Sequence, residues 1–275
     1  MTRSESSFPI KALIVDWAGT VVDFGSLAPV ASFMQVFRDE GVPISIAQAR
    51  EPMGLHKRDH IRALTRMPAV AAAWRARHDH DCDERDVDRM YEAFVPAQLA
   101  ALDQHSDLIP GLLPVVFECR SRGMKIGSTT GYAQSMIDKV SAAAREQGFE
   151  PDSIVCGTDA PIGRPAPWMA LEAARRMNVF PMNAIVKIDD TIAGIHEGRN
   201  AGMWTIGVTA TGNEVGLSES DFDHLPPTKR AELLDGATKR MLAAGADFVV
   251  PSIADILPIL DQIAARGQGN ARSLM

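Results

Sequence analysis

The stretch PIKALIVDWAGT, residues 9–20, indicates how this chain folds. It begins as a short run of branched apolar residues, reaches Asp16, and continues into WAGT, where a glycine interrupts regular structure. This order is typical of a buried β-strand followed by its exit loop. An aspartate at that point caps loops in many proteins, but it also lies where parallel sheets bind their ligands. The position alone leaves both a structural and a catalytic role open for Asp16.

Runs of the same kind recur along the chain and predict further short strands, at residues 124–128, 153–156, 184–188, 203–208 and 246–250. Helical patterns lie between most of them, at residues 112–122, 132–147, 167–178, 192–201 and 229–244. Strands that alternate with helices form a parallel, doubly wound sheet whose ligands bind at the carboxyl ends of the strands. We therefore predict an α/β fold with a Rossmann-like parallel sheet as its core.

The alternation is interrupted once, between residues 26 and 106, where the sequence contains helical patterns and no convincing strand. The helices predicted in this block cover residues 26–41, 46–50, 57–66, 68–78 and 84–101. Such a block is typical of an inserted α-helical cap domain. We expect a discontinuous Rossmann-like core formed by residues 1–25 and 107–275, with the cap domain at residues 26–106. A cap inserted beside the carboxyl edge of the sheet is well placed to act as a lid.

The composition is that of a globular protein, with 46% hydrophobic and 23% charged residues in a chain of 275. The net charge of −7 argues against nucleic acid or an anionic membrane as a partner. Any anionic ligand must therefore be held by a local cluster of positive charge.

The cysteines give no sign of a disulfide framework or a zinc cluster. There are three of them, Cys82, Cys119 and Cys156, and no two have the CxxC spacing. The apolar stretch at residues 8–15 is interrupted by Lys11 and is too short for a signal peptide or a membrane span. We expect a protein of the reducing cytoplasm.

Three further segments contain candidate residues for binding a metal ion or an anion. Asp189 and Asp190 end the predicted strand at 184–188, so they join Asp16 at one sheet edge, where acids can share an oxygen-seeking cation such as Mg²⁺. The hydroxyls and N–H groups of STTG, residues 128–131, precede a helix and form either an anion site or an ordinary N-cap. Arg164, in a Gly/Pro loop, is either a solvated surface residue or a cation that meets a phosphoryl group.

These segments, in their order along the chain, resemble the haloacid dehalogenase superfamily of aspartyl-nucleophile phosphotransferases; the motifs are DWAGT, STTG, GRP and KIDDT. The segment PMGLHKRDH, residues 52–60, is similar to the lysine-bearing cap segment of the phosphonoacetaldehyde hydrolase (phosphonatase) family. The same family is matched by GSTTGY at 127–132, GRPAPWM at 163–169 and EGRNAGMWT at 197–205. The resemblance extends from about Lys11 to about Val250.

The resemblance implies hydrolysis of the P–C bond of phosphonoacetaldehyde to acetaldehyde and phosphate, in 2-aminoethylphosphonate degradation. It assigns Asp16 as the nucleophile, Lys57 as the Schiff-base residue and His60 as a candidate for proton transfer. It also implies a Mg²⁺ cofactor and a homodimer formed through the cap. The implied metal ligands are Asp16, the carbonyl of Ala18 and Asp190. The implied substrate-binding residues are Thr130, Gly131 and Arg164 for the phosphoryl group, and Met53 and Tyr132 for the aldehyde.

Ala18 departs from the superfamily pattern in a way that fits this chemistry. Most members carry a second aspartate at that position, two residues after the nucleophile, as a general acid for the leaving oxygen. A phosphonate has a carbon leaving group, which a carboxylic acid does not usefully protonate as it departs. That carbon needs an electron sink, which an imine on Lys57 supplies.

Two other readings of the sequence stay open: a Mg²⁺-dependent phosphatase of a small phosphate ester, and a non-catalytic protein that binds phosphoanions. Ala18 and the cap segment argue against the first reading, and the intact set of Asp16, Lys57 and Asp190 argues against the second. Asp189 stands where relatives commonly have glycine, and Gly194 stands where many have a further acid. His56 is left without a role.

Overall fold

The computed structural model describes residues 9–272, with side chains described as far as residue 266. A single sheet of six parallel strands has the order β3-β2-β1-β4-β5-β6. The strands are β1 Ala12–Val15, β2 Lys125–Thr130, β3 Ser153–Cys156, β4 Ile185–Asp189, β5 Trp204–Val208 and β6 Phe248–Val250. The predicted parallel α/β fold is therefore confirmed, with strand ends that shift by a few residues.

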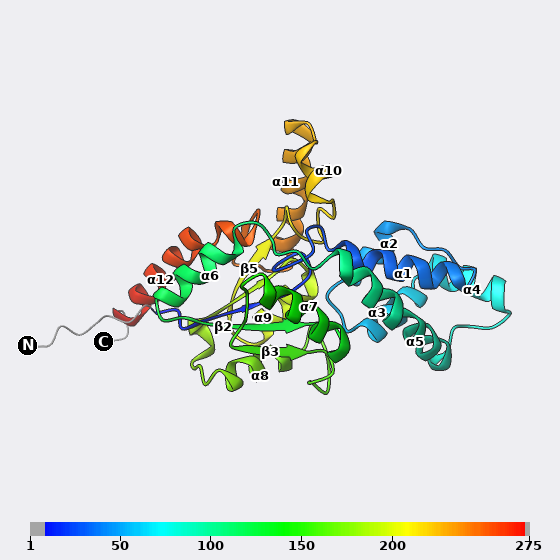
Figure 1. Cartoon of the computed structure of the whole chain (residues 1–275), viewed down its shortest axis with the longest axis horizontal. Coiled ribbons are helices and arrows are strands. Elements are labelled where there is room, and N and C mark those ends of the chain that lie inside the picture. The colour runs from blue at the N-terminus through cyan, green and yellow to red at the C-terminus, as the bar shows by residue number, and fades with distance from the viewer. Residues whose placement is uncertain (1–8, 273–275) are drawn as a thin grey trace, which may run out of the picture.

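Helices cover both faces of this sheet (Figure 1). They are α6 Leu112–Ser121, α7 Gln134–Glu146, α8 Trp168–Arg176, α9 Ile192–Asn200, α11 Pro227–Ala243 and α12 Leu257–Arg272. Successive side chains of β1 point to opposite faces of the sheet, because a strand has a period of two residues. Leu13 and Val15 pack in one apolar cluster with α6, α7 and α12, whereas Ala12 and Ile14 pack in a second cluster with α8.

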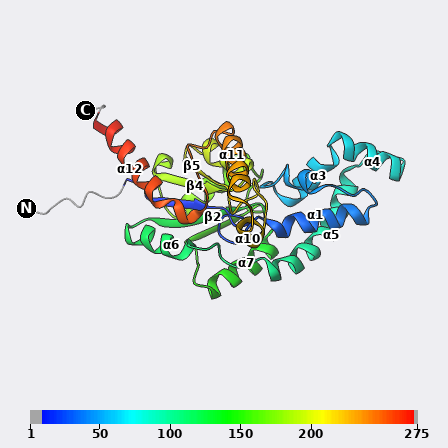
Figure 2. The same ribbon diagram turned by 90° about the horizontal axis from the view of Figure 1, so that it is seen from above.

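The inserted helices gather at one end of the molecule, beside the carboxyl edge of the sheet (Figures 1 and 2). They are α1 Leu27–Asp39, α2 Ile46–Arg50, α3 Lys57–Thr65, α4 Pro68–His78 and α5 Glu84–Ala101. Aromatic side chains hold α1 and α5 together, with the rings of Phe33 and Phe94 stacked at 4.4 Å between centroids. All five helices predicted for this block are present, while its exact boundaries at residues 26 and 106 stay a prediction.

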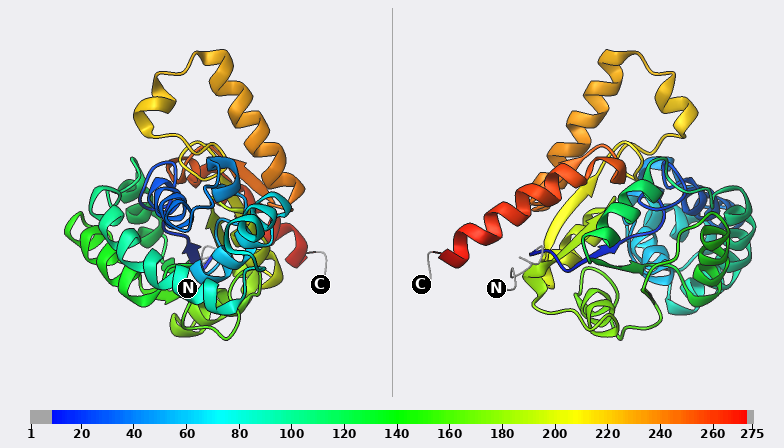
Figure 3. Two further views of the ribbon diagram at one scale, coloured as in Figure 1. Left: turned by 90° about the vertical axis from the view of Figure 1, so that its right-hand side faces the viewer. Right: turned by 60° about the vertical axis from the view of Figure 1, so that its left-hand side comes forward.

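Some helices were not predicted from the sequence. They are α10 Glu219–Asp223, α12 and three 3₁₀ turns, η1 Leu102–Gln104, η2 Met182–Ala184 and η3 Ile253–Asp255. The 3₁₀ turns and α10 are too short to show a helical period, and α12 contains Gly267 and Gly269, which weaken its helical signal. Figure 3 shows α10 and α11 as an arm that stands out from the sheet.

Candidate active site

Three carboxylates meet at the carboxyl edge of the sheet. Asp16 follows β1, Asp189 is the last residue of β4 and Asp190 follows it. The strands are neighbours in register, with Val15 opposite Ile188, so their exit loops leave the sheet side by side. One oxygen from each acid lies within 4.8 Å of the others, and all three side chains are buried. The fold thus unites acids that are far apart in the sequence.

Hydrogen bonds distinguish Asp189 from Asp190. The Lys187 ammonium donates to Asp189 Oδ2 at 2.7 Å, and the Thr191 hydroxyl donates to Asp189 Oδ1 at 2.7 Å. Asp190 Oδ2 accepts from the backbone N–H of Asn213 at 2.8 Å, whereas Asp190 Oδ1 is buried and has no hydrogen-bond partner in the described part of the chain. Asp190 therefore has a free oxygen to offer a metal ion, while both oxygens of Asp189 are already engaged.

Burial and neighbouring charges shift the pKa values of these acids in different directions. Burial raises the pKa of Asp16, against the lowering effect of the Arg164 guanidinium. Burial and the carboxylates of Asp16 and Asp189 raise the pKa of Asp190 well above its ordinary value. Burial also acts on Asp189, but Arg164 and Lys187 outweigh it and hold the pKa of Asp189 below its ordinary value.

The charges of this buried region do not balance without a cation. Its cations are Arg164, Lys187 and Lys57, and its carboxylates are Asp16, Asp189, Asp190 and Glu197. When all of these groups are charged, one negative charge is left over, and uncompensated buried charge is costly. A divalent cation that prefers oxygen ligands would compensate it and counter the repulsion among Asp16, Asp189 and Asp190, and the free oxygen of Asp190 is one ligand for it. The described residues therefore fit a dication at this site.

Adding Mg²⁺ is expected to raise the temperature at which the protein unfolds, because an ion that binds only the folded chain stabilises it by mass action. The gain is about 2.7 kcal/mol when the ion is at about 100 times its dissociation constant. Differential scanning fluorimetry with and without Mg²⁺ measures the shift. Asp190→Asn should lose most of it and the exposed Asp261→Asn should keep it; an unshifted wild-type protein would contradict the metal site.

A buried arginine joins the acids to the second strand. Arg164 Nη2 donates to Asp16 Oδ1 at 2.7 Å and to the carbonyl of Thr129 at 2.9 Å, and Arg164 Nε donates to Glu197 Oε2 at 2.9 Å. The hydroxyl of Thr129 donates to the same Glu197 oxygen at 3.0 Å. Glu197 thus holds Arg164 in place beside Asp16. No role was predicted for it, because acidic residues on helices are usually solvated.

Lys57 is the first residue of α3 and is almost completely buried, with 4% of its surface exposed. Its Nζ lies 5.1 Å from the centre of the Tyr132 ring and 5.8 Å from the centre of the Phe33 ring. Burial lowers the pKa of Lys57 to about 8, although the Asp16 carboxylate acts in the opposite direction. A large fraction of this amine is therefore uncharged near pH 8.

Two histidines flank Lys57 in the sequence and differ in setting. His60 is fully buried, stacks on Phe33 at 3.7 Å between ring centroids, and places Nε2 3.0 Å from the carbonyl of Ala49. A carbonyl only accepts, so the proton of neutral His60 is on Nε2 and its Nδ1, which has no partner in the described part of the chain, carries the lone pair. Burial lowers the pKa of His60 well below its ordinary value. His56 precedes α3 at its N-cap.

A small cavity between the cap and the core collects most of the predicted site residues. Its wall includes Asp16, Ala18, Met53, Lys57, Thr130, Gly131, Tyr132 and Arg164. It also includes four residues that were not predicted, Ser26, Pro29, Gly54 and Thr191. The cavity has a free volume of about 20 Å³, which is room for about one water molecule. A larger ligand therefore needs the side chains or the cap around the cavity to shift.

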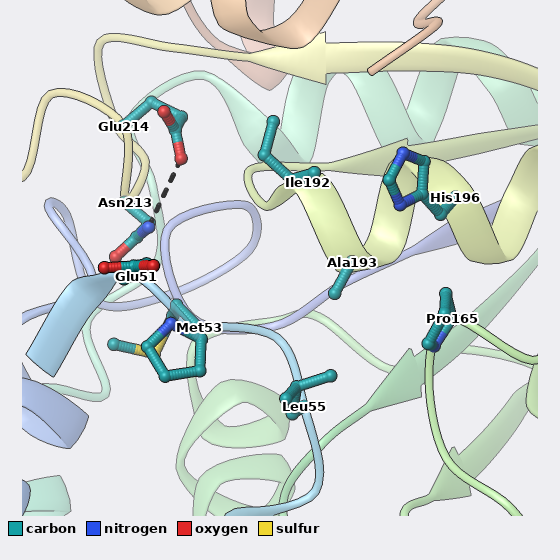
Figure 4. Close-up of a pocket in the computed structure, with 10 residues that line it drawn as sticks. Glu51, Met53, Leu55, Pro165, Ile192, Ala193, His196, Asn213 and Glu214 are labelled. Atoms are coloured by element: carbon teal, nitrogen blue, oxygen red, sulfur yellow. Dashed lines mark hydrogen bonds between the residues drawn. The ribbon is translucent and has the colours of Figure 1, made fainter. Parts of the chain in front are cut away.

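A second cavity, of about 230 Å³, adjoins the first and is drawn in Figure 4. Met53 and Leu55 line it from the cap loop, and Ile192 and Ala193 line it from the start of α9. Met53 lies in the walls of both cavities, so the small space beside Asp16 and the larger one meet at its side chain.

Comparison with known proteins agrees with this arrangement. Residues 10–202 match the family model of haloacid dehalogenase-like hydrolases. The chain is 46% identical over 258 residues to phosphonoacetaldehyde hydrolase of Nitratidesulfovibrio vulgaris, covering 94% of this chain and 92% of that protein. It is 42% identical over 254 residues to the Bacillus cytotoxicus enzyme of the same name, covering 92% and 96%. A crystal structure of a phosphonoacetaldehyde hydrolase-like protein from Oleispira antarctica superposes with a TM-score of 0.93 at 41% identity, covering 97% of both chains.

Proposed function

Because this chain belongs to the phosphonoacetaldehyde hydrolase family of haloacid dehalogenase-like hydrolases, we propose that it cleaves phosphonoacetaldehyde to acetaldehyde and phosphate in 2-aminoethylphosphonate degradation. One observation carries the proposal: Lys57 from the cap and Asp16 from the core lie in the wall of one small cavity. An amine and a carboxylate are thereby offered to the two ends of a small substrate, the aldehyde and the phosphonate.

Lys57 activates the aldehyde end. Its uncharged amine attacks the carbonyl carbon, and loss of water from the adduct leaves a protonated imine. Burial against the rings of Phe33 and Tyr132 supports this step, because it lowers the pKa of Lys57 to about 8 and so supplies uncharged amine. The small volume of the cavity and the burial of Lys57 and Asp16 also limit the access of bulk water to the imine.

Asp16 then attacks phosphorus. The P–C bond breaks, its electron pair moves into the protonated imine, and an aspartyl-phosphate and an enamine result. Water releases phosphate from Asp16, while the enamine takes up a proton and is hydrolysed to acetaldehyde and free Lys57. The hydrogen bond from Arg164 supports this role, because it orients the carboxylate and favours its charged form.

Asp16, the carbonyl of Ala18 and Asp190 are the residues that would hold Mg²⁺. When bound, the ion would supply positive charge that draws phosphonate oxygens toward Asp16 and offsets the excess of buried carboxylates. The unpartnered oxygen of Asp190 and the place of Ala18 in the cavity wall support this assignment.

Residues of both domains bind the two ends of the substrate. Thr130, Gly131 and Arg164 offer a hydroxyl, a backbone N–H and a guanidinium to the phosphonate. Met53 and Tyr132 enclose the aldehyde end. A Cβ at Gly131 would collide with the carbonyl oxygen of Leu55 in the cap loop, which explains why only glycine fits where the cap meets the phosphonate site.

His60 takes up protons during imine formation, through Nδ1. The ring lies one helical turn from Lys57, and its Nε2 proton is held by a backbone carbonyl, so the free lone pair is fixed on Nδ1. Burial lowers its pKa well below the ordinary value, so the ring is neutral and its Nδ1 lone pair is available to accept a proton.

The rate of P–C cleavage is expected to rise with pH and to level off above about pH 8, because the reactive form of Lys57 is its uncharged amine. A dication bound beside Asp16 adds positive charge near Lys57, which lowers its pKa further and moves the midpoint of the profile to lower pH. Initial rates and the yield of imine trapped with borohydride, measured at the same series of pH values, should rise together. A trapped yield that falls as the pH rises toward 8 would contradict this assignment of the amine.

One assay separates this function from the two alternatives. The protein is incubated with phosphonoacetaldehyde and Mg²⁺, acetaldehyde and phosphate are measured, and borohydride is added to locate any reduced adduct by mass spectrometry. Acetaldehyde release with an adduct on Lys57 supports the proposal. Hydrolysis of small phosphate esters without an adduct supports a phosphatase, and turnover of neither substrate supports a protein that only binds phosphoanions.

The resemblance that supports the activity also supports a homodimer formed through the cap, and the free cysteines Cys82, Cys119 and Cys156 support a location in the reducing cytoplasm. Within residues 9–272 the structure contains no helix of the length and apolar character needed to cross a membrane. Size-exclusion chromatography with light scattering tests the dimer directly.

A further inference from the structure

Arg50, the last residue of α2, joins the cap to the core at a point outside the cavity. Its Nη1 donates to the carbonyl of Gly25 at 3.0 Å, to the carbonyl of Ser26 at 3.5 Å and to Asn213 Oδ1 at 3.1 Å. Its Nη2 donates to the carbonyl of Gly216 at 2.9 Å. Gly25 and Ser26 lie just before α1, where the chain enters the cap, and Asn213 and Gly216 lie in the loop after β5. One guanidinium therefore ties the hinge of the cap to the carboxyl edge of the sheet.

Asn213 connects this contact to the metal-binding acids. Its side-chain amide donates back to the carbonyl of Arg50 at 3.3 Å, so the two residues bind each other in both directions. Its backbone N–H donates to Asp190 Oδ2 at 2.8 Å, which leaves Asp190 Oδ1 free. The position of Asn213 thus sets the orientation of the Asp190 carboxylate.

Glycines in the backbone around Arg50 allow close contacts with the side chains of Arg50 and Asp190. Gly25 and Gly216 both have positive φ angles, of 87° and 68°, which side chains rarely allow. A Cβ at Gly216 would lie 2.6 Å from the guanidinium carbon of Arg50, and a Cβ at Gly212 would collide with Asp190. The loop therefore packs closely against Arg50 at Gly216 and against Asp190 at Gly212.

We propose that Arg50 and Asn213 are positioning residues that couple closure of the cap to the orientation of Asp190 for the metal ion. When the cap opens, Arg50 leaves Asn213 and the loop that holds Asp190 is freed; when the cap closes, the loop is fixed again. Because coupling is reciprocal, the metal ion also favours the closed cap. The proposal rests on the proposed metal site but not on the identity of the substrate.

Metal affinity and cap mobility are both measurable without turnover. Mn²⁺ binding is followed from the free-ion signal in electron paramagnetic resonance, and hydrogen–deuterium exchange is followed in the α2 peptide at residues 43–50, with and without Mn²⁺. In the wild-type protein Mn²⁺ should slow exchange in this peptide, which contains no proposed metal ligand. In Arg50→Lys, which keeps the charge but not the fork of donors, the Mn²⁺ dissociation constant should rise about tenfold and saturating Mn²⁺ should no longer slow exchange.

Matched variants identify the contact. Asn213→Ala keeps the backbone N–H to Asp190 and should behave as Arg50→Lys does, and the double variant should lose no more than the more affected single variant. Arg62→Lys is the control, since the hydrogen-bond partners of Arg62, Asp59 and Glu84, belong to the cap; it should bind Mn²⁺ as the wild type does. The coupling is overturned if the folded Arg50 and Asn213 variants bind Mn²⁺ with wild-type affinity. It is also overturned if Mn²⁺ does not change hydrogen–deuterium exchange of the α2 peptide in the wild-type protein. A loss in Asn213→Ala alone overturns it too. None of these measurements uses the substrate, so a protein that does not cleave phosphonoacetaldehyde would still give the results expected from the coupling.

Discussion

Lys57→Arg is expected to abolish P–C bond cleavage, with a loss on the order of 10⁴-fold or more, although the positive charge is kept. A guanidinium does not condense with an aldehyde to an imine, and it stays protonated where the buried lysine has a pKa of about 8. Without the imine, the electron pair of the P–C bond has no acceptor when Asp16 attacks phosphorus. The measurement is acetaldehyde release from phosphonoacetaldehyde at saturating Mg²⁺, together with borohydride trapping.

The control for this variant is Lys239→Arg. Lys239 lies on α11, exposed, in an ion pair with Asp235 of the same helix at 2.6 Å, so the same exchange there should leave both acetaldehyde release and the adduct on Lys57 unchanged. Lys57→Arg should retain the Mg²⁺-dependent shift in unfolding temperature, which shows that the site is still formed. Acetaldehyde release at the wild-type rate in Lys57→Arg would contradict the imine mechanism.

The fold could be predicted because each of its signals is local. Most strands are short apolar runs, although β2 ends in Ser128, Thr129 and Thr130, and the stretch from residue 26 to residue 106 stands out by the absence of such runs. The exact strand ends were not predictable, because they depend on pairing: β1 is confined to Ala12–Val15, where both neighbours pair with it. α10 and the 3₁₀ turns lacked a pattern of sufficient length.

Site residues could be predicted where a motif assigns them a role. They could not be predicted where the role depends on contacts that form only in the folded chain. Asp16, Lys57 and Arg164 stand in recognisable motifs, and the structure places all three in one cavity wall. Glu197 and Asn213 reach the site through hydrogen bonds from distant segments. Glu197 begins the motif EGRNAGMWT, but the motif assigned it no role, and Asn213 stands in none of the quoted motifs. The difference between the adjacent acids Asp189 and Asp190 is likewise set by their partners, which the sequence does not reveal.

Asp16→Asn is expected to abolish phosphate release, with a loss on the order of 10⁴-fold or more, while leaving imine formation intact. The amide has nearly the shape of the carboxylate but is a poor nucleophile toward phosphorus. The amine of Lys57 still meets the aldehyde, so the imine accumulates one step before bond cleavage. Borohydride should then give an adduct on Lys57 that retains the phosphono group, whereas the wild-type adduct, trapped after cleavage, lacks it. Mass spectrometry of the peptide that contains Lys57 separates the two.

Removal of one carboxylate also changes the charge of the site, and this must be separated from the loss of the nucleophile. The substitution reduces the excess of buried negative charge and removes a metal ligand, so Mg²⁺ should bind more weakly and the comparison is made at several Mg²⁺ concentrations. If weak metal binding were the whole effect, high Mg²⁺ would restore phosphate release; the nucleophile assignment requires that it does not. Asp138→Asn, at an exposed position on α7, serves as the matched control and should release phosphate normally. An adduct without the phosphono group in Asp16→Asn would show that the P–C bond breaks without Asp16, because only cleavage removes phosphorus before the hydride arrives.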